Sequence, residues 1–145
     1  MVDVNGQDII KGIIKALNNE FGKNYTYYIN DIPQGFEEPS FYVRLLDSNF
    51  NLICANRYLR KNIFIIRYFP KSELEPQQEI NAILDRLYSI LEYIYMGKDL
   101  IRGTNMEANI VDNILHLQIH YDFFVIRPIQ RGPLMQKLIQ KQKVK

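Results

Sequence analysis

The sequence predicts an α+β fold: one largely antiparallel sheet of about five strands, two helices packed on one face, an extended β arm and a C-terminal tail. Two observations carry this prediction. Apolar residues recur at three- and four-residue steps in two segments, which is typical of helices that face a core. Over residues 115–125 the chain instead alternates strictly: Leu115, Leu117, Ile119, Tyr121, Phe123 and Val125 share one face, opposite His116, Gln118, His120 and Asp122.

The first half of the chain predicts one helix, a short strand and two long strands. Helical spacing over 9–21 predicts a helix that stops at Gly22. A β-prone run over 25–29 and a turn at 33–35 follow. Residues 40–46 and 52–69 then predict two strands joined by a polar tip at 47–51.

The second of these long strands changes character along its length. Residues 63–69 are apolar on both faces, which predicts a central strand. Residues 56–61 are too polar for a core, so the two strands should extend beyond the body as an arm.

The second half predicts another helix and a long hairpin. Pro70 closes the strand, and an apolar stripe from Ile80 to Ile94 predicts a helix that ends at Gly97. The hairpin covers 100–126, with Val111, Asp112 and Asn113 at its turn. This order predicts a single domain over residues 1–130. With both helices on one side, the other face of the sheet should stay partly bare.

Length and composition limit the function classes. At 145 residues, with 47% hydrophobic and 23% charged residues, the chain is typical of one globular domain. No apolar run approaches the ~20 residues of a membrane-spanning helix, and the first residues do not resemble a secretory signal. We therefore expect no membrane partner and synthesis in a cytoplasm.

The net charge of +2 hides an asymmetry between the body and the tail. Residues 1–126 carry a net charge of −4, whereas 127–145 contain no acidic residue and six basic ones: Arg127, Arg131, Lys137, Lys141, Lys143 and Lys145. A basic tail over 131–145 can be a solvated terminus, a contact with a neighbouring subunit, or, less favoured, a contact with DNA.

No group of residues predicts catalysis, a cofactor or a metal site. The single cysteine, Cys54, lies about sixty residues from either histidine. His116 and His120 are about 13 Å apart if they lie on one strand, too far to ligate one ion. The acidic pairs at 37–38 and 73–75 occur in turn-like segments without an apolar pocket. Gly103 fits a β-bulge or a close backbone approach better than a phosphate loop. The protein is not expected to be an enzyme.

Three segments resemble a family of phage tail terminator or tail completion proteins from Gram-positive phages and phage-derived tail-like elements. They are Gln34-Gly35-Phe36-x-x-Pro39-x-Phe41, Asn56-Arg57-Tyr58-x-Arg60 continuing to Tyr68-Phe69-Pro70, and Arg102-Gly103-Thr104-Asn105-Met106 followed by Ile110-Val111-Asp112. The resemblance covers most of residues 5–127.

The resemblance implies a structural protein that caps the head-proximal end of the tail tube as a ring of six copies. Its partners would be further copies of itself, the tail tube protein, and the sheath protein or the head connector. Such a ring needs a heterologous interface. We expect the interface to include these basic residues: Arg44, Arg57, Arg60, Lys61, His116, Lys137 and Lys141.

Two alternatives remain open at this stage. The protein could join a finished tail to the head without controlling tube length. Its aromatic and arginine residues could also form a nucleic-acid-binding surface, although the same composition is typical of protein interfaces.

Overall fold

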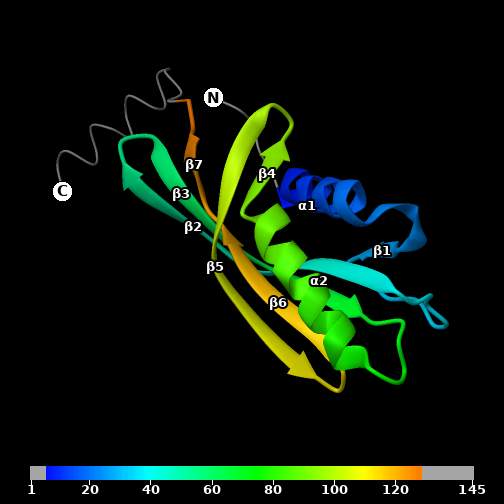
Figure 1. Ribbon diagram of the computed structural model, residues 1–145. Helices are drawn as coiled ribbons and strands as arrows, with labels where there is room; N and C mark the ends of the chain where they lie inside the picture. The colour runs from blue at the N-terminus through cyan, green and yellow to red at the C-terminus, as the bar shows by residue number, and fades with distance from the viewer. Residues whose placement is uncertain (1–5, 129–145) are drawn as a thin grey trace.

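The described part of the chain, residues 6–128 of a computed structural model, is a curled sheet that carries two helices on one face (Figure 1). In chain order its elements are α1 (Gly6–Phe21), a 3-10 turn (Gly22–Asn24), β1 (Thr26–Ile29), β2 (Ser40–Cys54), β3 (Arg57–Phe69), α2 (Pro76–Leu91), β4 (Tyr93–Met96), β5 (Asp99–Val111), β6 (Ile114–Tyr121) and β7 (Phe123–Ile126). The α+β class predicted from the sequence is confirmed.

The sheet has seven strands rather than about five. Its order is β1-β2-β3-β6-β5-β4, and β7 pairs with β3 outside this path. Every pairing is antiparallel except that of β1 with β2. The two extra strands arise where a predicted element divides: β4 takes residues assigned to the second helix, and β7 separates from β6 at Asp122.

One face of the sheet and both helices enclose the core. The alternation of β6 is confirmed, because Leu115, Leu117, Ile119 and Tyr121 are fully buried. They pack with apolar residues of the other strands and helices, including Phe41, Val43, Phe64, Ile66, Tyr68, Ile9, Ile13, Leu17, Ile80, Leu87 and Leu91. Burying this much apolar surface is the main force that holds the helices on the sheet.

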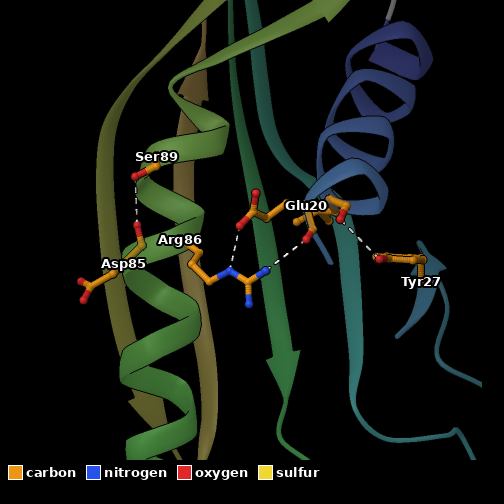
Figure 2. A network of polar contacts seen from close by, with 6 residues as sticks. Glu20, Tyr27, Asp85, Arg86 and Ser89 are labelled. Carbon is orange, nitrogen blue, oxygen red and sulfur yellow. Dashed lines mark hydrogen bonds and ion pairs between the residues drawn. The ribbon is translucent and has the colours of Figure 1, made fainter. Parts of the chain in front are cut away.

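A polar contact joins the end of α1 to α2. Figure 2 shows two hydrogen bonds from Arg86 of α2 to Glu20. Nε donates to the Glu20 carboxylate at 2.8 Å, and Nη2 donates to the Glu20 backbone carbonyl at 3.0 Å. The guanidinium also lies over the ring of Phe21, 4.3 Å from its centre. A cation at a helix C-terminus satisfies carbonyls that have no partner within the helix. Gly22 then leaves the helix at φ +82°, as the sequence predicted.

The predicted turn at 47–51 is wrong, because β2 continues through it to Cys54. The chain reverses at Ala55 and Asn56 instead, and Ala55 adopts a positive φ of 51°. Polar residues are tolerated in this stretch because every residue of β2 from Asp47 onward is exposed. Register shifts at Leu46 and Ile53 keep the pairing with β3 intact.

The predicted end of the second helix at Gly97 is also wrong. The helix ends at Leu91, and Gly97 lies in the turn between β4 and β5 with φ +62°. In β4, Ile94 and Met96 are buried and alternate with exposed residues, which is a strand pattern. Gly12 lets α1 approach this strand, because a Cβ at that position would collide with the carbonyl oxygen of Tyr95.

Two local predictions in the hairpin are confirmed. Asp112 and Asn113 form its two-residue turn with φ of 52° and 60°, the left-handed backbone expected there. Gly103 is a close backbone approach, because its amide donates to the Glu92 carbonyl at 2.6 Å. A β-bulge follows it, between Thr104 and Glu107.

Candidate subunit interface

The face of the sheet that points away from the helices, here called the open face, is built from rows of directly paired residues. The first row is Tyr42, Arg67, His116 and Asn109; the second is Arg44, Ile65, Gln118 and Glu107; the third is Asp47, Ile63, His120 and Thr104. Arg44 is exposed, and the two histidines and Gln118 are half-buried. Tyrosine and arginine are enriched at protein interfaces, so the Tyr42, Arg67 and Arg44 side chains make this face a candidate interface.

Arg67 organises the first row. Its guanidinium lies over the Tyr42 ring, 5.3 Å from the centre, while the Tyr42 hydroxyl donates to the Asn30 carbonyl at 2.8 Å. Partial burial, together with the positive charge of Arg67, holds the pKa of His116 below its usual range. His116 therefore enters this surface as a neutral side chain near pH 7. The Nε of Arg67 is buried and has no hydrogen-bond partner within the described residues.

The second surface is the arm, defined as residues 47–61 together with β7 and Arg127. The predicted arm is present as a projecting part of the sheet, with its tip at Ala55 and Asn56 (Figure 1). Strand parity divides its charges between two faces. Arg57 and Lys61 continue the open face, whereas Arg60 lies on the opposite side with Tyr58.

Aromatic rings hold the arm's arginines. Arg57 lies over Phe124 at 4.3 Å, and Arg60 lies near Phe123 at 5.7 Å. Arg127 contacts a stacked pair, with its guanidinium carbon 4.9 Å from the Phe50 ring centre and 5.2 Å from that of Tyr58. Cation–π contacts of this kind orient a guanidinium without neutralising it.

Asn62 fixes the base of the arm. This buried side chain donates to the Tyr121 carbonyl at 2.9 Å, and its oxygen accepts from Ser48 and from Arg60 Nε. Its backbone amide donates to Asp122 at 3.1 Å. These contacts lie where β6 gives way to β7, so they set the direction in which β7 joins the arm.

A third surface was not identified from the sequence. Tyr93 and Tyr95 of β4 and Leu100 of β5 are all more than half exposed. Tyr95 is paired with Leu100, so the two share a face, and Arg102 lies near the ring of Tyr93. Tyr93 and Tyr95 also line a hollow together with residues of α1, including Gly12, Lys15 and Ala16. The alternation Tyr-Ile-Tyr-Met over 93–96 was the signal that could have revealed this apolar patch.

The structure therefore brings together only part of the predicted interface set. Arg44, His116, Arg57 and Lys61 share the open face and its extension, whereas Arg60 lies on the other side. Lys137 and Lys141 lie outside the described residues, as does the whole predicted tail over 131–145.

Within residues 6–128, no cluster of three or more His, Cys, Asp or Glu side chains has a geometry that would hold a metal ion. The helices of the same region are too short and too polar to cross a bilayer. Cys54 is exposed near the tip of the arm and forms no disulfide.

The fold and these surfaces define an α+β protein whose chemically distinctive residues lie on exposed strands rather than in a closed pocket. A family model described as phage tail terminator protein matches residues 8–133. The chain belongs to this family, and it is therefore a structural protein of phage tail assembly, a component of a virion or a tail particle. The match confirms the family resemblance, while a Gram-positive origin stays a prediction.

No curated protein sequence matches the chain. One similar solved structure aligns with 88% of this chain and 99% of its own chain, at 11% identity and a TM-score of 0.43.

Proposed function

We propose that the protein caps the head-proximal end of the tail tube as a ring of six copies, ends tube growth, and presents a surface to the head connector or the sheath. The observation that carries this proposal is the family match, which extends over nearly all of the described chain. Assembly would take place in the cytoplasm of the bacterial host. The family is one of structural assembly proteins, so no reaction is assigned to it.

The surfaces on the sheet support a ring. Copies in a closed ring meet through two different patches, one on each side of the subunit. The open face and the arm offer basic and aromatic groups, and the patch of Tyr93, Tyr95 and Leu100 offers an apolar surface on β4 and β5. Aromatic residues and arginine are enriched at protein interfaces.

Deletion of the gene in the parent phage or tail-like element tests the proposal by electron microscopy of the tails. Tubes that are too long or irregular in length would support termination. Tails of normal length that fail to join heads would instead support a joining role without length control. Normal complete particles would contradict both, and salt-sensitive DNA binding by the purified protein would favour a nucleic-acid role.

A further inference from the structure

The two ends of the sheet carry opposite charge. The arm holds four basic residues and one acidic residue: Arg57, Arg60, Lys61, Arg127 and Asp47. Four positive charges against one negative charge leave the arm with a net charge of +3. The arm is therefore a cationic projection.

The opposite end of the sheet, here called the acidic end, consists of the loops at 30–39 and 70–75 and the β5–β6 turn (Figure 1). Phe36 of the first loop packs on Phe69, the last residue of β3, from which the second loop continues. Pairing of Tyr68 with Leu115 brings the β5–β6 turn to the same end. Its exposed charges are six acidic residues and one basic residue: Asp31, Glu37, Glu38, Glu73, Glu75, Asp112 and Lys71.

Neither end neutralises its charge within the described chain. The ion pairs of residues 6–128 join Arg86 to Glu20 and Arg102 to Glu92, and they involve neither the arm nor the acidic end. On the arm, the Arg57 and Arg127 guanidiniums contact aromatic rings, which leaves their N–H groups to bind a carboxylate.

A single copy cannot bring the two ends together. Strand β3 alone runs thirteen residues from Arg57, near the tip of the arm, to Phe69 at the acidic end. At about 3.3 Å per residue this is about 40 Å. Salt screens exposed charges over about 8 Å under physiological conditions, so the two ends do not attract each other within one chain.

We infer that the arm of one copy binds the acidic end of the next copy, so that Arg57 and Lys61 face the carboxylates around Glu37 and Glu73. The inference rests on the proposed ring and names one pair of patches that meet in it. Because the patches differ, the contact is heterologous, and repeating it produces a closed ring if the rotation between copies permits closure. The partner that the arm binds is thus a second copy of this chain rather than DNA. A second copy accounts for both ends of the sheet, whereas DNA would repel the acidic end.

Charge exchange tests the contact. The variant Arg57→Glu with Lys61→Glu, and separately Glu37→Lys with Glu73→Lys, should each weaken self-association of the full chain on the order of tenfold or more at low salt. Mixing the two variants should restore association between unlike copies only. Lys11→Glu, which reverses an exposed charge of α1 outside the surfaces described above, is the control and should leave association unchanged. Sedimentation and native mass spectrometry measure the association.

Cross-linking tests the same contact in assembled tails, whether or not the purified protein forms rings. Cys54 lies exposed near the tip of the arm, and Glu73→Cys would add a thiol at the acidic end. Mild oxidation should then produce a ladder of covalent multimers. The unmodified chain, with one cysteine, can form dimers at most, and Lys11→Cys on the exposed side of α1 controls for random collision.

The outcomes separate this inference from the proposed function. Absence of the ladder in tails, together with no loss of association on charge reversal, overturns the arm contact even if the gene deletion lengthens the tubes. Retained association with lost DNA binding in Arg57→Glu with Lys61→Glu would assign the arm to DNA and also overturn it. A ladder in a particle whose tube length does not depend on the gene would keep the contact and reject length control.

Discussion

The side-chain amide of Asn62 donates a 2.9 Å hydrogen bond to the carbonyl of Tyr121, at the residue where the long second strand of the hairpin breaks. The same amide group accepts from Ser48, on β2, and from Arg60. One buried side chain therefore joins β2, β3 and the junction of β6 with β7. It is the structural link between the body of the sheet and its arm.

Replacing Asn62 with alanine should destabilise the protein by about 2–4 kcal/mol, because the buried Tyr121 carbonyl loses its donor while Ser48 and Arg60 lose their shared acceptor. Urea unfolding measures the change. Asn51→Ala, an exposed position of the arm, is the control and should stay within about 0.5 kcal/mol of the unmodified chain. An Asn62→Ala protein as stable as this control would show that the network does not hold the junction.

Gly103→Ala should also be destabilising, for a steric reason. An added Cβ would lie 2.5 Å from the Ile119 side chain and 2.8 Å from the Leu91 carbonyl oxygen. Crowding of this kind in a packed core costs about 1–3 kcal/mol, and here one of the colliding atoms belongs to the backbone.

Gly97→Ala separates this steric cost from the cost of backbone conformation. Gly97 has φ +62° and no atom near an added Cβ, so its substitution should cost only about 1 kcal/mol. Thermal unfolding of the two variants gives the comparison. If both lose the same stability, the close approach at Gly103 is not what requires glycine there.

Glu79 should make stability depend on acid pH. Partial burial raises its pKa, but hydrogen bonds from the Tyr68 hydroxyl and from the amides of Lys71 and Ser72 outweigh this and lower the pKa below the usual 4.5. A lowered carboxyl pKa contributes stability above the unfolded value, and this stability is lost as the pH falls below about 4.5 through the folded value. Urea midpoints between pH 7 and pH 3 should show this loss.

In Glu79→Gln the same titration should show a lower midpoint at pH 7 and a smaller decline towards pH 3, because the titrating group is gone. Glu73→Gln, at an exposed position of the preceding loop, should follow the unmodified chain. A decline in Glu79→Gln as steep as in the unmodified chain would assign the acid sensitivity to other carboxylates.

Local patterns predicted the fold where local physics decides it. Alternation over Leu115–Tyr121 identified β6 because one face of that strand is entirely buried. The alternation continues through Phe123 and Val125, so it gave no sign that the strand breaks at Asp122. That break depends on Asn62, sixty residues earlier in the chain, and tertiary hydrogen bonds of this kind have no local sequence signal.

The wrong end of the second helix also results from tertiary contacts that have no local sequence signal. Leu91 and Ile94 are compatible with both a helical stripe and a strand, and the contact of β4 with α1 at Gly12 selects the strand. A helix over 93–96 does not predict the exposed surface that Tyr93 and Tyr95 form on β4. Arg57 and Arg60 are three residues apart on one strand, so their side chains point to opposite faces. Their shared positive charge is therefore not sufficient to place both in one interface.

Arg44→Glu should impair assembly without affecting folding. Arg44 is exposed on the open face, where it is paired with the buried Ile65 of the neighbouring strand. It forms no ion pair within residues 6–128. Reversing its charge should change the free energy of unfolding by less than about 0.5 kcal/mol, whereas a partner that meets this face would encounter the wrong charge. Complementation of a gene deletion with Arg44→Glu should therefore give fewer finished tails, counted by electron microscopy. Lys11→Glu, on the exposed side of α1, should complement fully, and equal yields from the two variants would remove the open face from the interface.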